Sequence, residues 1–415
     1  MIYDVADISL AAEGKQKIDW VKSYMPLLGS LEEEFSETKP FSNIKVSLSV
    51  HLEAKTAYLC KVLAAGGADM AVTGSNVLST QDDVASALAS EGMKVFAKHN
   101  ASKDEYFKHI EMTLEHQPHI IIDDGGDLIN LLYNKRSDLM ENLIGGCEET
   151  TTGIIRLRAM EADGVLQNPM VAVNDAYCKH MFDNRYGTGQ SVWDGINRTT
   201  NLITAGKNVV VSGYGWCGRG IAMRAKGLGA KVIVTEIDPI KAVEAVMDGY
   251  DVMKMEKAAE LGDIFITATG CDRIITKEHM EKMKDGAILC NAGHFNVEID
   301  IGEMEKLAVD VRERRKNIMG YKMKDGRWLN ILGEGRLVNL ASGDGHPAEI
   351  MDMSFALQAL SAKYLIENKE KLGNSVIGVP KEIDLRVAHM KLKSWDMEID
   401  ALSAHQKEYL TSWNV

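Results

Sequence analysis

The sequence predicts an α/β protein with two doubly wound parallel-sheet domains and a small helical C-terminal segment. A chain of 415 residues is too long for a single ordinary hydrophobic core. Along most of it, short β-rich runs alternate with helical stretches, which is typical of parallel sheets with helices on both faces. One glycine-rich turn also lies between a strand pattern and a helix pattern, as dinucleotide-binding folds require.

The first domain, a substrate-binding domain, is predicted over residues 1–184. Apolar runs rich in β-branched residues mark its strands. These runs are Ile44–Leu52, Ala68–Gly74, Met93–Ala97, His119–Asp123 and Met170–Val173. Residues 348–368 have helical periodicity, and we expect residues 348–375 to complete this domain.

The second domain, which carries the glycine-rich turn, is predicted over residues 185–347. Its strand runs are Val209–Ser212, a run that ends at Glu236, Ile264–Thr269, Ala287–Asn291 and a short run at Arg336–Ala341. Residues 376–415 are charged and helical, and we expect them to form a C-terminal oligomerisation segment. With two such domains, ligands should lie between them, at the carboxyl ends of the strands.

The glycine-rich turn, GYGWCGRG, has the spacing of a dinucleotide-binding site. Gly213 permits the tight turn, Gly215 lets the backbone approach a pyrophosphate, and Gly218 lets the helix pack closely on the strand. Free N–H groups at the start of the helix then face the phosphates. Glu236 ends the next strand, where a carboxylate accepts hydrogen bonds from a ribose diol and repels a 2′-phosphate. The turn therefore predicts NAD rather than NADP.

Composition excludes several classes of function. The net charge of -13 argues against a nucleic-acid surface, which needs clustered basic residues. No apolar run reaches transmembrane length, and the N-terminus lacks the layout of a secretory signal. The six cysteines are scattered without a CxxC pair, so we expect reduced thiols in a cytoplasmic protein. No group of residues has the spacing of a metal site.

Polar side chains gather after several strand runs, in numbers that turns alone do not require. They are His51, Glu53, Lys55 and Thr56, then Asn76 and Ser79, Asp124, the run Glu149 to Thr152, and His294, Asn339 and His346. Lys179, Asp183 and Asn184 lie about one helical turn apart on a helical stretch. For each cluster taken by itself, the alternative to a site is that its residues cap helices or form solvated turns. Their repetition at strand ends favours a shared site.

Several longer segments resemble S-adenosyl-L-homocysteine hydrolases, over essentially the whole chain. They are SNVLSTQDD (75–83), IIDDGGDL (121–128), EETTTG (148–153), FDNRYGTGQS (182–191), GYGWCGRG (213–220), VTEIDP (234–239), NAGHFNVEID (291–300), GEGRLVNL (333–340) and GHP (345–347). Enzymes of this family use tightly held NAD to oxidise the ribose 3′-hydroxyl, which makes the C4′ hydrogen acidic. Homocysteine then leaves by elimination, water adds at C5′, and the ketone is reduced again.

By matching position, the resemblance implies a role for individual residues. The implied catalytic residues are His51, Asp124, Glu149, Lys179, Asp183 and His294. The implied substrate-binding residues are Glu53, Lys55, Thr56, Asn76, Ser79, Asp124, Glu149, Lys179, Asp183 and His346. The implied NAD contacts are Thr150, Thr151, Thr152, Asn184, Gly213, Tyr214, Gly215, Trp216, Cys217, Gly218, Glu236, Ala292, Gly293, His294 and Asn339. No metal is implied.

Lys179 is implied to help remove the 3′-hydroxyl proton. A lysine does this only if its surroundings hold its pKa low, so we expect Lys179 to be enclosed with a lowered pKa. For the C4′ proton, Lys179 is the first candidate base and Asp124 the second.

Glu53 and Lys55 depart from the commoner family pattern, which has a threonine and a glutamate that read adenine. A lysine only donates hydrogen bonds, so it suits the C6 carbonyl of hypoxanthine better than the amine of adenine. Glu53 suits a protonated ring N1. We therefore expect S-inosyl-L-homocysteine as the substrate, as is proposed for a branch of the family in methanogens. If both side chains point to solvent, adenine remains the expected base.

The C-terminal sequence also departs from longer family members, whose tail reaches NAD in a neighbouring subunit. This sequence ends at Val415, so we expect that contact to be missing or replaced and NAD to be held differently. We still expect a homotetramer. Two other functions stay open at this point. One is an NAD-dependent 2-hydroxyacid dehydrogenase, and the other is an NAD-binding relative that has lost catalysis.

Overall fold

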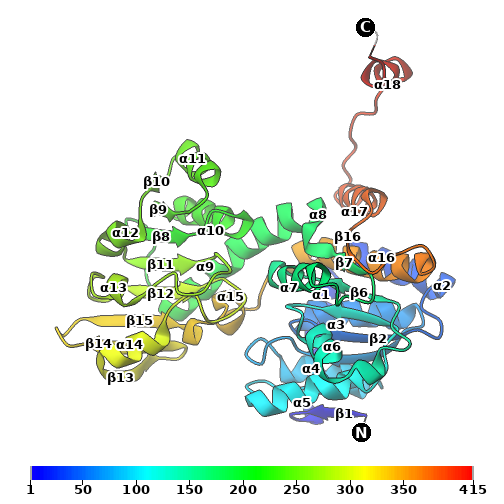
Figure 1. Cartoon of the computed structure of the whole chain (residues 1–415), viewed down its shortest axis with the longest axis horizontal. Helices are drawn as coiled ribbons and strands as arrows, with labels where there is room; N and C mark the ends of the chain where they lie inside the picture. The colour runs from blue at the N-terminus through cyan, green and yellow to red at the C-terminus, as the bar shows by residue number, and fades with distance from the viewer. Residues whose placement is uncertain (1, 414–415) are drawn as a thin grey trace.

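The computed structural model describes residues 2–413 and has two lobes, each built around one eight-stranded sheet (Figure 1). All strand pairs of the first sheet are parallel, in the order β1-β4-β3-β2-β5-β6-β7-β16. Its strands are β1 (Tyr3–Val5), β2 (Lys45–Ser49), β3 (Asp69–Thr73), β4 (Lys94–Ala97), β5 (Ile120–Asp123), β6 (Gly145–Glu148), β7 (Met170–Ala172) and β16 (Val376–Gly378). The sheet thus includes residues beyond 375, where the sequence placed the start of the C-terminal segment.

The second sheet has the order β10-β9-β8-β11-β12-β15-β14-β13. Its strands are β8 (Asn208–Ser212), β9 (Lys231–Thr235), β10 (Asp251–Val252), β11 (Ile264–Thr267), β12 (Ile288–Asn291), β13 (Ala308–Arg315), β14 (Ile318–Met323) and β15 (Trp328–Leu332). Pairing is parallel except at β13–β14 and β14–β15, an antiparallel edge that the sequence analysis missed. The predicted α/β class with two mostly parallel sheets is confirmed.

The strand predicted at Arg336–Ala341 is wrong. β15 already occupies the place beside β12, with Ile288 opposite Asn330. Leu337 makes only an isolated bridge to Asn291, and the chain then turns into the short helix α15 (Val338–Ala341). Asn339 is therefore presented from a helix rather than from a strand end.

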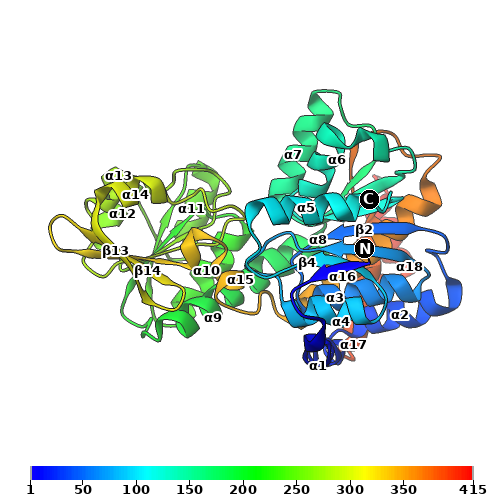
Figure 2. The ribbon, with the colours of Figure 1, turned by 90° about the horizontal axis from the view of Figure 1, so that it is seen from below.

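Helices cover both faces of each sheet, as Figures 1 and 2 show. Those of the first lobe are α1 (Ala11–Lys22), α2 (Pro26–Thr38), α3 (Ala54–Ala65), α4 (Asp82–Ser90), α5 (Lys103–Leu114), α6 (Asp127–Lys135), α7 (Thr151–Ala162), α16 (Ala348–Asn368) and α17 (Lys381–Ser394). After β7 come α8 (Tyr177–Lys179), which packs on α16 and α17 of the first lobe, and a π-helical segment (His180–Gly187). The helices around the second sheet are α9 (Thr188–Thr200), α10 (Trp216–Gly227), α11 (Pro239–Met247), α12 (Met255–Leu261), α13 (Lys277–Met280) and α14 (Ile301–Leu307). The last helix, α18 (Ala404–Thr411), stands away from both lobes in Figure 1.

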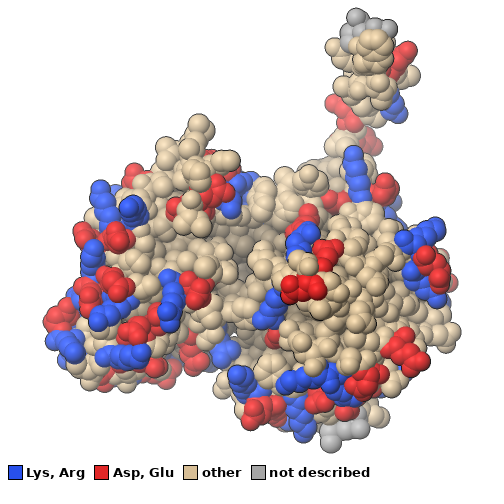
Figure 3. Space-filling model, viewed as in Figure 1, with Lys and Arg blue, Asp and Glu red and all other residues tan. Residues whose placement is uncertain are grey.

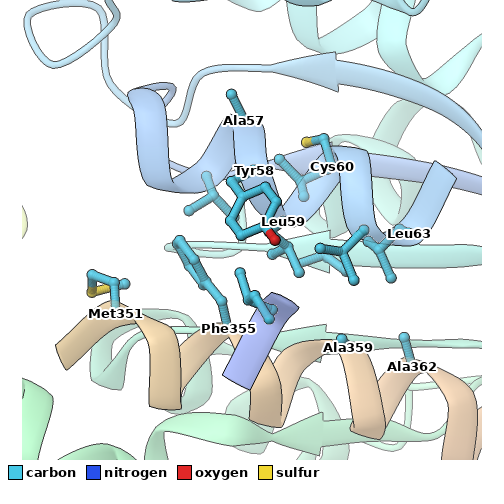
Figure 4. Close-up of a cluster of buried hydrophobic side chains, with 14 of the residues drawn as sticks. Ala57, Tyr58, Leu59, Cys60, Leu63, Met351, Phe355, Ala359 and Ala362 are labelled. Atoms are coloured by element: carbon cyan, nitrogen blue, oxygen red, sulfur yellow. The ribbon is translucent and has the colours of Figure 1, made fainter. Parts of the chain in front are cut away.

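The core of the first lobe includes a helix from the C-terminal part of the chain. α16 packs against α2 and α3, and Figure 4 shows Phe355 and Met351 of α16 facing Tyr58 and Leu59 of α3. These side chains are buried, and burying each large apolar side chain stabilises the fold by about 1.5–3 kcal/mol. Among the residues the structure describes, no helix combines the length and apolar composition needed to cross a bilayer.

Asp352 of α16 ties three helices of this lobe together. Its carboxylate accepts hydrogen bonds from the N–H groups of Leu28 (2.9 Å) and Leu27 (3.1 Å) at the start of α2. The Lys391 amine of α17 lies 3.6 Å away, and both charged side chains are buried. Negative charge at a helix N-terminus is favourable, so Asp352 fixes where α2 begins.

We expect Asp352→Ala to lower the free energy of unfolding by about 3 kcal/mol, because it leaves two buried N–H groups without an acceptor and removes the carboxylate beside the buried Lys391 ammonium, which keeps only the Glu349 carbonyl oxygen at 2.8 Å. Asp352→Asn should lose less, since its amide oxygen still accepts from α2. Urea unfolding of the two variants measures the difference. An Asp352→Ala protein as stable as the wild type contradicts this account.

Candidate functional site

The larger cavity of the site, of about 1200 Å³, opens at the carboxyl ends of β8, β9, β11 and β12. It extends to the start of α7 in the first lobe, and Figure 3 shows the hollow between the two lobes. Of the predicted NAD contacts, its wall contains Thr150, Thr151, Thr152, Asn184, Gly213, Gly215, Trp216, Cys217, Glu236, Ala292, Gly293 and His294. The cavity is large enough for a dinucleotide, since pockets for drug-sized ligands occupy about 300–1,000 Å³.

The glycine turn has the shape that a pyrophosphate requires. Gly213 has φ of 92°, a left-handed conformation that glycine adopts without strain. A Cβ at Gly218 would lie 1.9 Å from the Gly213 carbonyl oxygen, so no side chain fits between helix α10 and the turn. A Cβ at Gly215 would meet nothing within 4 Å, and Gly215 lies on the cavity wall at the N-terminus of α10. Open space therefore lies where the helix dipole favours negative charge.

Glu236 is held at the rim of this cavity by the backbone. Its carboxylate accepts hydrogen bonds from the N–H groups of Tyr214 (2.6 Å) and Ile237 (2.7 Å). A carboxylate has further acceptor sites, which suits a ribose diol. The Tyr214 hydroxyl instead donates to Asp248 at 2.5 Å, so Tyr214 contributes its backbone and not its ring to the turn.

A smaller cavity of about 140 Å³ lies beside the first, at the carboxyl ends of the first sheet. Of the predicted catalytic and substrate residues, its wall contains His51, Glu53, Thr56, Asp124, Glu149, Lys179, Asp183, His294 and His346. The two cavities share wall residues, namely Thr150, Thr151, Asn184, Cys217, Ala292 and His294. A ligand in the small cavity therefore lies next to one in the large cavity.

Lys179 is the centre of the small cavity. The unusual π-helical segment places Asn184 five residues on, with its side-chain oxygen 2.8 Å from the Lys179 amine. Asp183 lies 3.2 Å and Glu149 3.5 Å from the same nitrogen. Asn174 also accepts from Lys179, at 3.3 Å. Lys179 is enclosed, with 5% of its surface exposed.

The expectation that Lys179 has a lowered pKa is wrong. Burial alone lowers the pKa of this amine, but the neighbouring carboxylates of Asp183, Glu149 and Asp124 raise it above its ordinary value. Lys179 is therefore an ammonium in this structure. Burial raises the pKa of Glu149 to about 7, although Lys179 opposes that shift.

Asp183 is held from three directions. Its oxygens accept from Lys179, from His346 and, at 2.8 Å, from the Ser354 hydroxyl of α16. Burial raises the pKa of Asp183, but Lys179 and His346 more than reverse this and lower it. Asp183 is therefore ionised and acts as a hydrogen-bond acceptor.

His51, Asp124 and His294 form a second polar group across the small cavity. The Nδ1 atom of His51 lies 2.6 Å from the Ser79 hydroxyl, and its Nε2 atom lies 3.5 Å from Asp124. The ring centroids of His51 and His294 are 6.1 Å apart. Burial lowers the pKa of His51 to about 4, so its ring is neutral near pH 7. A neutral imidazole beside a carboxylate is suited to proton transfer.

Some predicted site residues lie behind the cavity walls. Ser79 contacts His51, and the Asn76 side chain accepts from the Leu78 N–H at 2.9 Å. Lys55 contacts Glu53 rather than lining the small cavity. The predicted NAD contact Asn339 lines the small cavity instead of the large one, while Tyr214 and Gly218 lie beneath the glycine turn.

Sequence reasoning missed three residues that hold the predicted ones in place. Gln358 of α16 donates to Glu149, Ser354 donates to Asp183, and Asn174 links Lys179 to the Thr151 hydroxyl (3.0 Å). Ser354 and Gln358 are four residues apart and so share a face of α16, whose buried residues are mostly apolar. Two buried polar positions at that spacing are the signal that could have found them.

The arrangement defines a class of protein: a nucleotide-dependent enzyme in which an NAD pocket adjoins a small pocket of acids, histidines and one lysine. Comparisons with known proteins give the family. A family model described as the NAD binding domain of S-adenosyl-L-homocysteine hydrolase matches residues 184–345. A second, described as S-adenosyl-L-homocysteine hydrolase, matches residues 2–141. The chain belongs to the S-adenosyl-L-homocysteine hydrolase family, and it is a hydrolase that uses NAD, as the sequence predicted.

Curated relatives agree with the family but carry two names. The chain is 58% identical over 412 residues to the S-inosyl-L-homocysteine hydrolase of Methanocaldococcus jannaschii, covering 99% of each chain. It is also 58% identical over 411 residues to the adenosylhomocysteinase of Pyrococcus abyssi, covering 99% of this chain and 97% of the relative. Overall identity therefore does not distinguish the two purines. The family excludes the alternative of a 2-hydroxyacid dehydrogenase.

We expect Gly218→Ala to lose most of its bound NAD, because the new methyl group would displace the turn or the helix α10. Gly227→Ala is the matched control, since Gly227 lies in the same helix and has no neighbour within 4 Å of a built Cβ. Nucleotide released by denaturing each purified protein gives the NAD content per subunit. Equal content in the two variants contradicts the packing role of Gly218.

Proposed function

We propose that this enzyme cleaves S-(purine nucleosyl)-L-homocysteine into homocysteine and a nucleoside, and that S-inosyl-L-homocysteine is the preferred substrate. The observation that carries the purine preference is a buried ion pair of Glu53 and Lys55 at the small cavity. Glu53 lines that cavity, and the Lys55 amine lies 2.6 Å from its carboxylate. The alternative in which both side chains point to solvent does not hold, because 6% of Glu53 and 5% of Lys55 is exposed.

Local structure explains why the pair is fixed. Glu53 precedes α3 as its N-cap, and its carboxylate accepts from the Lys55 backbone N–H at 3.4 Å. The Lys55 amine also donates to the Asp344 carbonyl oxygen at 2.8 Å, across to the second lobe. An ammonium has three N–H donors, and two have partners here. Among the described residues the third donor has no partner, and it lies behind Glu53 at the wall of the small cavity.

The remaining hydrogen-bond capacity matches hypoxanthine. Hypoxanthine offers a carbonyl oxygen at C6 to a lysine donor and an N1–H to a carboxylate acceptor. Adenine presents the reverse pattern, an amine at C6 and an unprotonated N1, so both contacts would face like groups. A site built for one hydrogen-bond pattern discriminates against its reverse by orders of magnitude, because buried polar groups are left unpaired.

The same geometry supports roles for the other residues of the small cavity. Bound NAD supplies the oxidation and later reduction at the ribose 3′ position. The Lys179 ammonium and the Asp183 carboxylate hold the ribose hydroxyls, and Glu149 lies within reach of Lys179. Because Lys179 is charged, it is a poor base for the C4′ proton, and we assign that step to the carboxylate of Asp124. His51 exchanges protons near C5′ and sulfur.

The purine preference is tested by kcat/KM for the two nucleosyl-homocysteines. We expect the wild type to favour the inosyl compound at least about tenfold, which corresponds to about 1.4 kcal/mol. The double variant Glu53→Thr with Lys55→Glu should shift the ratio toward the adenosyl compound. Lys61→Glu, a charge reversal at the surface of the same helix, should leave the ratio unchanged. A strong adenosyl preference in the wild type rules out this assignment.

We further propose that the enzyme is a cytoplasmic homo-oligomer, a tetramer, assembled through its C-terminal arm, residues 395–413. The arm exposes large apolar side chains that a monomer leaves in water: Trp395, Met397, Ile399, Leu402, Tyr409, Leu410 and Trp413. Several exposed large apolar side chains on one segment are typical of an interface between subunits. The arm would cover a surface on a second copy.

We expect a chain truncated after Ser394 to lose the tetramer, because it retains α17 but lacks the exposed apolar arm. Size-exclusion chromatography with light scattering gives the molar mass of both forms. A full-length monomer with complete activity refutes the assembly, and a truncated tetramer refutes the role of the arm.

A further inference from the structure

Glu148 is a buried acid that lines neither cavity. It is the last residue of β6, and none of its surface is exposed. One of its carboxylate oxygens, Oε1, accepts two hydrogen bonds, from the N–H of Gly125 (2.9 Å) and from the N–H of Thr150 (3.0 Å). These two donors belong to different loops. Gly125 follows Asp124 of the small cavity, and Thr150 precedes α7 and faces the large cavity.

The carboxyl group of Glu148 is closely packed. A Cβ at Gly153 would lie 2.0 Å from Glu148 Cδ, so the first turn of α7 packs directly on the carboxyl group. Among the residues that the structure describes, its second oxygen, Oε2, has no hydrogen-bond partner although it is buried. A buried oxygen without a partner costs free energy, so the fold keeps this acid despite a penalty. Such an exception calls for an explanation.

The loop that Glu148 holds reaches the second lobe. Gly125 has φ of 104°, and a Cβ there would lie 2.4 Å from Nε2 of His294. Backbone and imidazole are therefore in close contact between the two lobes. The hydrogen bond from Gly125 to Glu148 thus holds in place the part of the first lobe that packs against His294.

We propose that Glu148 is a positioning residue that fixes the substrate loop at Asp124 relative to the cofactor loop at Thr150. A single oxygen atom sets the spacing of both loops, so it aligns the reacting sugar with the nucleotide. Misalignment by about 1 Å can cost about a hundredfold in rate. The inference rests on the proposed roles of Asp124 and Thr150, and it does not depend on which purine is bound.

The test compares Glu148→Ala, Glu148→Gln and Glu161→Gln as purified holoenzymes. Glu161→Gln is the matched control, because Glu161 also accepts a backbone N–H, from Val376 at 3.0 Å, but lines neither cavity. We expect Glu148→Ala to lose bound NAD and to lower kcat at least about tenfold, with KM changed less than about threefold. Glu148→Gln should keep both within about threefold, because its amide oxygen accepts the same two N–H groups.

A purely structural role predicts a different result. In that case Glu148→Ala lowers the melting temperature, but the NAD content and kcat of the folded variant equal those of the wild type. That outcome overturns the proposal. A Glu148→Gln variant that is as impaired as Glu148→Ala also overturns the proposal, since the glutamine side chain keeps the acceptor oxygen. If Glu148→Ala does not fold, Gly153→Ala displaces the carboxyl group while keeping it, and the same losses are expected. A wild type that cleaves neither nucleosyl-homocysteine refutes the proposed function, whereas NAD content still reports on Glu148.

Discussion

The buried positive charge of Lys179 is the constraint on which the rest of the site depends. Its ammonium has almost no contact with water, so the protein has to supply the acceptors that water would provide. Asp183, Glu149 and two asparagines do so within 3.5 Å. Breaking a buried pair by removing one partner costs about 3–5 kcal/mol, because the other charge stays buried without compensation. The carboxylates therefore have to be held rigidly.

That need for rigidity explains why distant parts of the chain meet at this site. Ser354 and Gln358 come from α16, about 170 to 210 residues after the acids they contact. Asp384 of α17 accepts from the N–H groups of Tyr177 and Cys178, both at 2.8 Å, and so fixes the start of the short helix that carries Lys179. The C-terminal helices thus belong to the support of the candidate site. An arm that joins subunits beyond α17 would be connected directly, through α17, to these supporting helices.

The fold could be predicted wherever a strand had a continuous apolar run. β2, β3, β5, β8 and β11 were found for this reason. β6 was missed because its sequence begins Gly145-Gly146, which resembles a turn. A Cβ at Gly145 would lie 2.5 Å from the Pro169 carbonyl oxygen, so close packing selects glycine there. The β13–β14 edge was missed because β13 is mostly exposed and charged, and exposure removes the apolar signal.

Site residues could be predicted where they follow strand ends within the long segments that resemble the family. Residues that act by holding other side chains in place were harder to predict. Glu148 is part of such a segment, yet only the three-dimensional structure shows that its carboxyl group joins two loops. The pKa of Lys179 could not be inferred either. Burial and neighbouring carboxylates have opposite effects on an amine, and their balance depends on distances that a sequence does not contain.

Contacts between the lobes connect base recognition with the exclusion of water. Lys55 reaches the Asp344 carbonyl oxygen, and Arg156 of α7 lies over the Phe295 ring at 4.9 Å, next to His294. An exposed cation–π contact such as that of Arg156 with Phe295 contributes about 0.5–1 kcal/mol, which is enough to favour contact between the two lobes but not to prevent their separation. The same lysine that would bond the purine also bonds the second lobe. Under the proposed function, a base held by Lys55 would therefore lie beside a contact between the two lobes.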